Sequence, residues 1–159
     1  MIEPPFLHLT PEQSRTLLSS ITNPRDKAII TLILHTGIFM RELTALTQKD
    51  IDLQNRTLII QGKRERKLSL SSQAHDAITA WLHRRPDSQS DLLFTTNRGK
   101  PRQLSDTAMD RLVRNYGRSV NLPFKLNCQI LRNTYGLHLA SEETDIAKLS
   151  YILGITDAP

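Results

Sequence analysis

The sequence predicts a mostly helical domain of the α+β class, with a small antiparallel sheet on one side. Two observations indicate the helices: apolar residues recur at helical spacing along most of the chain, and helix start signals precede several of these segments. A third observation indicates the sheet, because between residues 56 and 70 this spacing gives way to two strand-like segments around a glycine-containing turn. The 159 residues have the length of one ordinary domain, and no repeat or linker divides them.

The first expected helix begins at a capping box. Thr10 and Gln13 are three residues apart, so each side chain can accept a hydrogen bond from the backbone N–H of the other. Pro11 suits the first helical position because the N–H that proline lacks would have no partner there. We therefore expect a helix over residues 11–20.

A second start signal, Asn23 followed by Pro24, precedes an apolar segment at residues 28–34. A helix that is apolar nearly all round is expected to be buried rather than amphipathic. Gly37 is the expected C-cap, since glycine adopts the left-handed conformation at little cost. A short helix is expected to follow over residues 40–46.

The expected sheet is built around a basic hairpin. Strands are expected over residues 56–60 and 67–70, and the turn at residues 62–66 contains one glycine and four charged residues. A third strand is expected over residues 91–95. The sequence Asn-Arg-Gly-Lys-Pro at residues 97–101 has the composition of another turn.

The rest of the chain is expected to be helical. Ser105 is the N-cap of a helix that reaches Tyr116 and ends at Gly117. The helices expected in this part of the chain cover residues 72–84, 105–116, 128–141 and 145–153.

Composition limits the classes of function. The net charge of +5 and the isoelectric point of about 9.7 suit a polyanionic partner, of which nucleic acid is the commonest. No apolar segment approaches the roughly 20 residues of a membrane-spanning helix, and no secretion signal is visible. The single cysteine, Cys128, excludes an internal disulfide and a multi-cysteine zinc site. We expect a soluble, cytoplasmic protein with no membrane association, no metal and no small-molecule cofactor.

Three segments carry recognisable motifs. Residues 36–52 contain Thr-Gly-Ile-Phe-Met-Arg-Glu-Leu followed by Asp-Ile-Asp, residues 59–63 read Ile-Ile-Gln-Gly-Lys, and residues 131–155 begin Leu-Arg-Asn-Thr-Tyr and end Ile-Leu-Gly-Ile. In this order they resemble the catalytic domain of the tyrosine recombinases, the phage integrase family. The resemblance implies that residues 9–159 form a helical tyrosine-recombinase catalytic-like domain after a tail at residues 1–8, without the core-binding domain or the C-terminal tyrosine segment of that family.

In that family a tyrosine attacks a DNA phosphate, and cations fixed around the phosphate stabilise the charge that develops. The resemblance places the lysine of the hairpin on Lys63 and the second arginine on Arg132, so both are retained. Four other positions are substituted. Phe39 stands for the first arginine, Gln129 and Ile155 stand for two histidines, and Asn133 follows the second arginine where histidine is frequent.

These substitutions predict a protein that is not a working strand transferase. Gln129 cannot shuttle protons near neutral pH, and Ile155 has no hydrogen-bonding side chain. Loss of one preorganised donor can lower a rate by about 100- to 1000-fold. Arg41 lies two residues after Phe39, a rotation of roughly 200° on a helix, so it could replace the missing arginine only if the local backbone were rebuilt. The chain ends before the position of the family nucleophile, and its own tyrosines are expected to serve in packing.

Double-stranded DNA is the expected partner, with a full-length recombinase or a second copy of this chain as further candidates. The basic hairpin has an ordinary alternative interpretation as a solvated turn, and Arg132 could pair with Glu42 instead of binding a phosphate. The expected DNA contacts are Lys63, Arg64, Arg66, Lys67, Arg111, Arg114 and Arg132.

The leading hypothesis is therefore a catalytically inactive, nucleoid-associated DNA-binding protein of bacterial or phage type, with an accessory or regulatory role in recombination by mobile elements. One alternative is an active site-specific recombinase, or a fragment of one, in DNA integration or inversion. The other is a protein-interaction module that kept the fold without binding DNA. A continuous face of basic side chains would disfavour the last of these.

Overall fold

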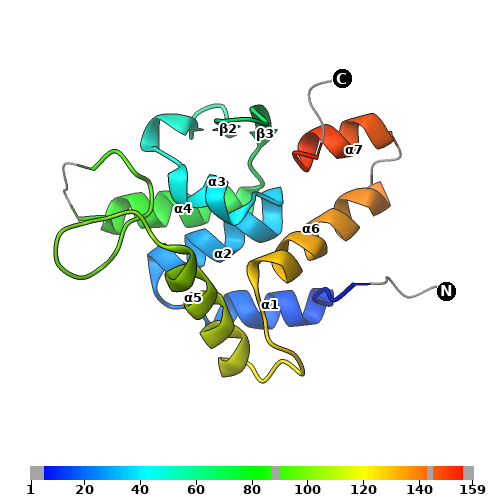
Figure 1. Ribbon diagram of the computed structural model, residues 1–159, viewed down its shortest axis with the longest axis horizontal. Helices are drawn as coiled ribbons and strands as arrows, with labels where there is room; N and C mark the ends of the chain where they lie inside the picture. The colour runs from blue at the N-terminus through cyan, green and yellow to red at the C-terminus, as the bar shows by residue number, and fades with distance from the viewer. Residues whose placement is uncertain (1–5, 87–89, 143–144, 156–159) are drawn as a thin grey trace.

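The computed structural model describes residues 6–86, 90–142 and 145–155. Helices surround a central helix, and a three-stranded sheet lies on one side (Figure 1). The mostly helical fold with a small antiparallel sheet is thus confirmed. The elements in order are α1 (Pro11–Ser20), α2 (Pro24–Thr36), α3 (Met40–Ala45), the 3-10 helix η1 (Gln48–Asp50), β1 (Ile51–Asp52), β2 (Thr57–Ile60), β3 (Arg66–Ser69), α4 (Ser72–Arg84), α5 (Asp106–Ser119), α6 (Cys128–Glu142) and α7 (Ile146–Ile152).

The first two helices begin where the capping residues predict. The Thr10 hydroxyl accepts from the Gln13 N–H, and the Gln13 side chain accepts from the Thr10 N–H. The Asn23 side chain caps α2 by accepting from the N–H of Asp26. At the other end of α2, Gly37 has φ +67°, and a Cβ there would lie 2.6 Å from the Tyr135 ring. Glycine is therefore required at this turn both for its conformation and for the close approach of α6.

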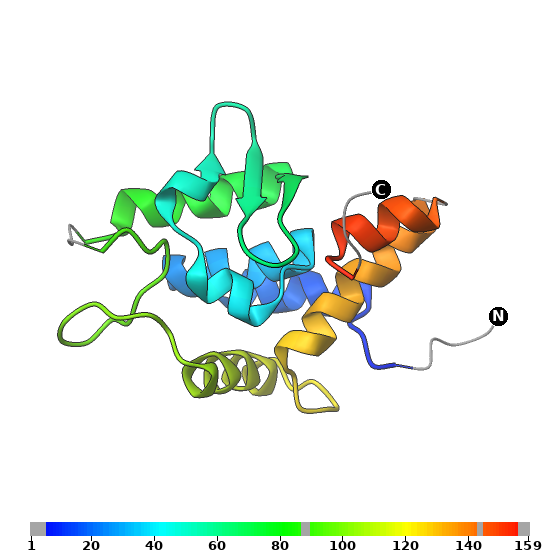
Figure 2. The same ribbon diagram turned by 45° about the horizontal axis from the view of Figure 1, so that its top comes forward.

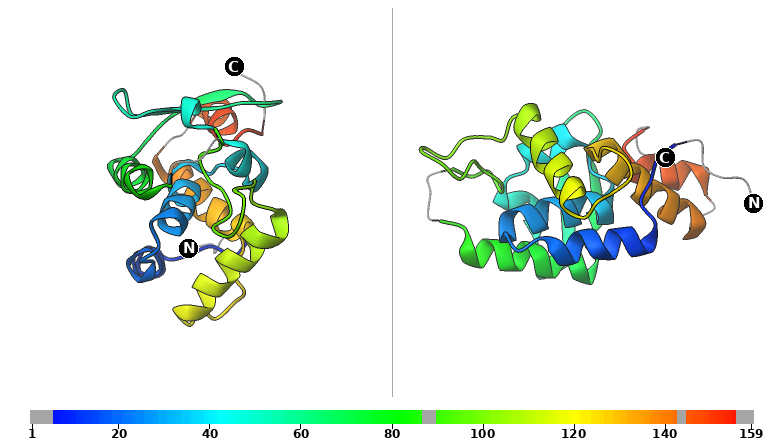
Figure 3. Two further views of the ribbon diagram at one scale, coloured as in Figure 1. Left: turned by 90° about the vertical axis from the view of Figure 1, so that its left-hand side faces the viewer. Right: turned by 90° about the horizontal axis from the view of Figure 1, so that it is seen from below.

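Helix α2 is the centre of the core. Residues 28–34 are all buried, and the helix packs against α1, α4 and α6. Figure 3 shows α1 and α4 on one side of α2, with α3 and α5 on the other. Burial of a Leu or Ile side chain contributes about 1.5–3 kcal/mol, so this apolar helix organises the packing of the domain.

The sheet has the order β1-β2-β3, and both strand pairs are antiparallel. The expected strand at residues 91–95 is wrong, because this segment forms only isolated bridges, Thr47 with Leu92 and Thr95 with Gln103. Its backbone groups bond to separate neighbours instead. The N–H of Leu93 donates to Leu46, and the Leu93 carbonyl accepts from the Trp81 indole. The apolar composition of this segment predicts a strand, but composition does not show where the backbone hydrogen bonds of the segment are made.

Helix α5 continues past its expected end. Gly117 lies inside the helix, and a Cβ there would be 2.6 Å from the Cβ of Leu126. The glycine thus permits close packing against the following segment rather than ending the helix. The chain turns at Asn121 instead, which adopts φ +58°.

Two loops project from the body of the domain, the turn between β1 and β2 and the segment between α4 and α5 (Figure 2). Among the described residues, no helix is both long enough and apolar enough to cross a bilayer, and no group of three or more His, Cys, Asp or Glu side chains could hold a metal ion.

A half-buried histidine connects α2 to the start of α4. The Nδ1 atom of His35 lies 2.7 Å from the Ser71 hydroxyl. The same hydroxyl oxygen caps α4 by accepting from the N–H of Ala74. Burial lowers the pKa of His35, and repulsion from His138 lowers it further. The neutral ring is thus the form that fits this junction.

Stability should consequently fall in mild acid. Because the pKa of His35 is lower in the folded protein than the ordinary value of 6.5, the unfolded chain takes up this proton first. The free energy of unfolding should therefore be unaffected by His35 above that pH and should decrease as the pH drops below it. Urea titrations at about pH 7.5 and about pH 5.5 check this. The variant His35→Gln should show a smaller decrease than the exposed control His83→Gln, and equal decreases would contradict the expectation.

Candidate functional site

A pocket of about 450 Å³ lies where α3, α5 and the start of α6 meet. Its lining includes Phe39, Gln129 and Arg132, three positions that the family resemblance assigns to the catalytic centre. The fold therefore brings together residues that are far apart in the sequence. Lys63 and Ile155 do not line this pocket; Lys63 is exposed in the hairpin turn, and Ile155 is 55% exposed after α7.

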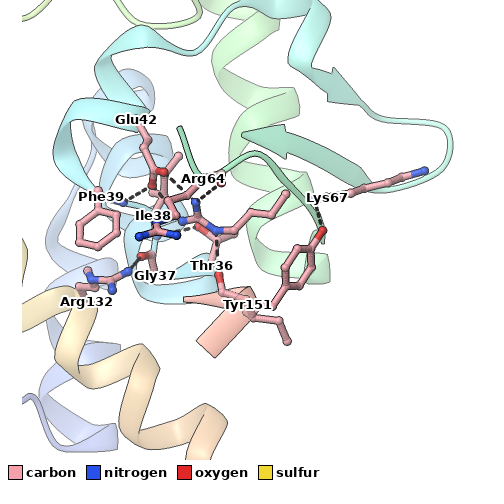
Figure 4. A network of polar contacts seen from close by, with 11 residues as sticks. Thr36, Gly37, Ile38, Phe39, Glu42, Arg64, Lys67, Arg132 and Tyr151 are labelled. Carbon is pink, nitrogen blue, oxygen red and sulfur yellow. Dashed lines mark hydrogen bonds and ion pairs between the residues drawn. The ribbon is translucent and has the colours of Figure 1, made fainter. Parts of the chain in front are cut away.

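Arg132 is held in place by the turn that follows α2. Its side chain donates a hydrogen bond to the Gly37 carbonyl, and its guanidinium carbon lies 3.5 Å from the centre of the Phe39 ring. Figure 4 shows the Phe39 ring beside the Arg132 guanidinium. The pKa of Arg132 is lowered to about 10, mainly by burial and secondly by repulsion from Arg66, while Glu42 opposes the shift. The group is still cationic at neutral pH, so a buried positive charge faces the pocket.

Phe39 stands where the resemblance places the first arginine. It precedes α3 as the N-cap residue, and its backbone N–H donates to Glu42 Oε1 at 2.9 Å. Its ring attracts the Arg132 cation through the negative face of the π system. An aromatic ring thus occupies this position, and it stabilises Arg132 without adding affinity for an anion.

Arg41 lines the same pocket and is exposed. The expected rotation of roughly 200° between Phe39 and Arg41 assumed that both residues lie on one helix. Helix α3 begins only at Met40, and Phe39 has an extended backbone with ψ 149°, so the helical rotation does not apply between them. The expectation was wrong for this local reason.

The charge of the pocket is mixed. Asp106 and Asp110, one turn apart on α5, line it together with the two arginines. Gln129 and Asn133 also bond to each other, with Gln129 Nε2 donating to Asn133 Oδ1 at 2.7 Å. Two carboxylates reduce the attraction of this pocket for a phosphate. The sequence does not predict these two carboxylates at the site, because the residue spacing within α5 does not show that its first turns pack near the start of α6.

Arg66 is buried and is not available as a surface contact. Its guanidinium donates to both oxygens of Glu42 at 2.7 and 2.9 Å and to the Ile152 carbonyl at 2.9 Å. The side chain is 1% exposed, and a Cβ on Gly154 would lie 2.6 Å from its central carbon. The expected role of Arg66 in DNA binding is therefore wrong. The Glu42 partner is Arg66, not Arg132.

The burial of Arg66 has a signal in the sequence. Side chains alternate between the two faces of a strand, and Leu68 and Leu70 are buried on the inner face. Arg66 belongs to the same face by this period of two. Lys67 has the opposite orientation, and Figure 4 shows its side chain pointing away from the network. The sequence analysis instead placed Arg66 in the turn with the other charged residues, to which this alternation does not apply.

The other expected contacts are more accessible. Lys63 and Lys67 are exposed and Arg64 is half-buried. Arg111 and Arg114 are exposed on α5 together with Arg118, and on a helix these three positions fall within an arc of about 60°.

The tyrosines of the described residues are engaged in the fold. The Tyr116 hydroxyl donates to Asp26 at 2.6 Å, and burial, followed by Asp26, raises the Tyr116 pKa. The Tyr151 hydroxyl accepts from the backbone N–H of Lys67 at 3.4 Å. Tyr135 packs on Gly37, and burial raises its pKa. None of these three lines the pocket beside Arg132.

Comparison with known proteins identifies the family. The sequence profile described as the phage integrase family matches residues 8–158. Tyrosine recombinase XerA of Thermococcus kodakarensis is 29% identical over 151 residues, which are 92% of this chain and 53% of that protein. Tyrosine recombinase XerC of Thermodesulfovibrio yellowstonii is 29% identical over 143 residues, which cover 84% of this chain and 47% of the relative. The chain spans about half the length of these curated relatives.

Solved structures share the fold. The crystal structure of XerA recombinase has a TM-score of 0.85 at 23% identity and covers 96% of this chain and 57% of that one. The Tn1549 transposon integrase, in complex with a circular intermediate DNA, has a TM-score of 0.80 at 25% identity and covers 96% and 59%. The profile match over nearly the whole chain, the shared fold and the pocket built from the motif positions agree: this chain belongs to the phage integrase family of tyrosine recombinases.

Proposed function

We propose that this chain is a DNA-binding member of the family that grips duplex DNA through phosphate contacts and does not transfer strands, with an accessory or regulatory role in recombination. The observation that carries the proposal is the stacking of Arg132 under Phe39, with 3.5 Å between the guanidinium carbon and the ring centre. Arg132 is retained at this site, but an apolar ring occupies the family position of the first arginine. The exposed Arg41 lines the same pocket together with the carboxylates of Asp106 and Asp110, which offset its charge.

Exposed cations support the binding half of the proposal. The net charge is +5, and a DNA complex of a relative, the Tn1549 integrase, shares the fold. Phosphate contacts of this kind position a protein on DNA without reading sequence. The side chains proposed for these contacts are Lys63, Arg64, Lys67, Arg111 and Arg114.

Three substitutions within the described residues support the inactive half. Phe39 cannot donate to a phosphate, Gln129 cannot exchange protons near neutral pH, and Ile155 offers no polar atom. The donors missing at Phe39 and Ile155 are each expected to lower a phosphoryl-transfer rate by about 100-fold or more. All three positions lie inside the chain, so their effect is independent of any segment that follows it.

Salt dependence tests the binding. In fluorescence anisotropy titrations with a short duplex, affinity should drop about 10-fold or more between about 50 mM and about 150 mM salt, because phosphate contacts release counterions. The double variant Arg111→Ala/Arg114→Ala should reduce the salt slope by roughly 2. Arg15→Ala/Lys27→Ala, which removes the same charge beside α4, is the matched control. Absence of binding at low salt would contradict the proposal and favour a protein-interaction module.

Strand transfer is tested with suicide substrates. An active recombinase is the second candidate, favoured by the retained Lys63 and Arg132 and by the names of the relatives. Incubated with nicked duplexes that trap a phosphotyrosyl intermediate, the chain should give no adduct on a denaturing gel, since its tyrosines are engaged elsewhere in the fold. A band at the mass of protein plus DNA would establish the second candidate instead.

A further inference from the structure

The segment between α4 and α5 forms a basic loop, residues 96–102, that contains Arg98, Lys100 and Arg102. All three side chains are exposed. No acidic residue occurs between Asp91 and Asp106, and none of the three cations forms an ion pair with the described part of the chain. The loop projects beyond the body of the domain next to the start of α5 (Figure 2). Its charge is therefore available to a partner.

The base of the basic loop is rigidly attached to the core. The Thr96 N–H donates to the Arg102 carbonyl at 2.9 Å, and the Arg102 N–H donates to the Thr96 hydroxyl at 3.1 Å. One residue earlier, Thr95 is 7% exposed, and its carbonyl accepts from Arg25 Nη1 at 2.9 Å.

Arg25 is itself held by its neighbour. It is 9% exposed and donates to Asp26 Oδ1 from Nε and Nη2 at 2.9 and 2.8 Å. On either side of the loop, Phe94 and Leu104 are buried in the core. These contacts fix the point at which the basic loop leaves the core, which favours recognition at a defined place on a partner.

The tip is narrow. Gly99 lies between Arg98 and Lys100 with φ +67°, and no atom lies within 4 Å of the position of a Cβ. Pro101 follows and fixes the backbone on that side. Because Gly99 has no side chain and open space around it, the backbone between the two cations can approach closely the floor of the minor groove of DNA, which is about 6 Å wide.

We propose that the basic loop enters the minor groove and prefers A·T over G·C base pairs. The inference rests on the proposed function, because it requires DNA as partner. Narrow A·T minor grooves carry an enhanced negative potential that attracts inserted Arg and Lys side chains. The N2 amino group of guanine stands on the floor of the groove and obstructs a tip that approaches closely. The loop thus adds base-composition preference to contacts that are otherwise made with phosphates.

Three duplexes test the inference. They share flanking sequences and differ over one helical turn, about 10 base pairs, which contains A·T, G·C or inosine·C pairs. Inosine lacks the N2 amino group, so an I·C pair has the minor groove of A·T and the major-groove pattern of G·C. The protein should bind the A·T and I·C duplexes with similar affinity and the G·C duplex about fivefold or more weakly.

Variants connect the preference to the loop. Arg98→Ala/Lys100→Ala should bind all three duplexes equally, and Arg98→Ala alone should reduce the preference. The control Arg15→Ala/Lys27→Ala, with the same change in net charge, should keep it. Circular dichroism confirms that each variant is folded, as expected for exposed loop residues.

Each other result overturns the inference in a distinguishable way. Equal binding of the unchanged protein to all three duplexes leaves DNA binding intact and removes the minor-groove role. An I·C duplex that behaves like G·C indicates reading from the major groove. If the double variant Arg98→Ala/Lys100→Ala keeps the preference for A·T pairs, that preference arises from another part of the protein. Absence of binding to every duplex overturns the proposed function itself.

Discussion

Replacing Glu42 with alanine is expected to destabilise the protein by about 3–5 kcal/mol, because the variant leaves the Arg66 charge buried without its carboxylate. The guanidinium is 1% exposed and the Glu42 side chain 16%, so solvent can compensate little. Glu42 also accepts the N–H of Phe39 at 2.9 Å. The same substitution therefore removes the cap of α3 beside the pocket.

Urea denaturation measures the effect, and the exposed hairpin residue Glu65 supplies the matched control Glu65→Ala. The double variant Glu42→Met/Arg66→Met should be less destabilised than the sum of its single changes, since no charge is left buried. A loss below about 1 kcal/mol for Glu42→Ala would place the pair in the range of exposed ion pairs and contradict its burial.

The pair also fixes α7. No residue of α7 is fully buried, and Arg66 donates to the Ile152 carbonyl at its end. Hydrogen exchange at residues 146–153 should thus accelerate in Glu42→Ala more than exchange in α2. Uniform acceleration would show that the pair stabilises the whole domain and has no special relation to α7.

Phe39→Arg is expected to cost about 2–4 kcal/mol of stability in the absence of anions. The variant loses the attraction between the Phe39 ring and Arg132. It also places two guanidinium groups near each other at the pocket, where repulsion at about 4 Å amounts to about 4 kcal/mol at an intermediate effective dielectric. Rotation of the new side chain toward solvent reduces the cost, which sets the lower end of the range.

An anion should reverse this loss. Sulfate bound between the guanidinium introduced by Phe39→Arg and the guanidinium of Arg132 would stabilise the folded state by mass action. Thermal denaturation with increasing sulfate should raise the Tm of Phe39→Arg more than that of the unchanged protein. Phe6→Arg, at a residue 43% exposed, controls for the added charge. Equal sulfate responses of Phe39→Arg and Phe6→Arg would show that position 39 does not face an anion site.

Local order along the chain could be predicted from the sequence. The capping box at Thr10, the Asn23 cap and the glycine after α2 depend on residues within a few positions of one another, and each formed as expected. The apolar segment at residues 28–34 became the buried centre of the core. The three motifs identified the family because they occur in the same order and at the same spacing as in the shared fold of the family.

Contacts between distant segments could not be predicted in the same way. Apolar residues 91–95 read as a strand, yet their backbone partners come from separate elements. The sequence predicts a helix end at Gly117, but the structural role of this glycine is to let Leu126 pack closely against the helix. Arg66 read as a surface cation because the identity of a side chain does not show whether a carboxylate lies beside it inside the protein.

The sequence by itself determined the family and the helical architecture, and it showed Phe39, Gln129 and Ile155 at positions that the family resemblance assigns to catalysis. Only the tertiary structure decided which cations are available. Arg66 is buried against Glu42, and Arg132 lies under Phe39 at a pocket that Asp106 and Asp110 also line. The physical reason is that helix and strand signals arise from neighbouring residues, whereas burial and ion pairing arise from side chains that meet only when the chain has folded.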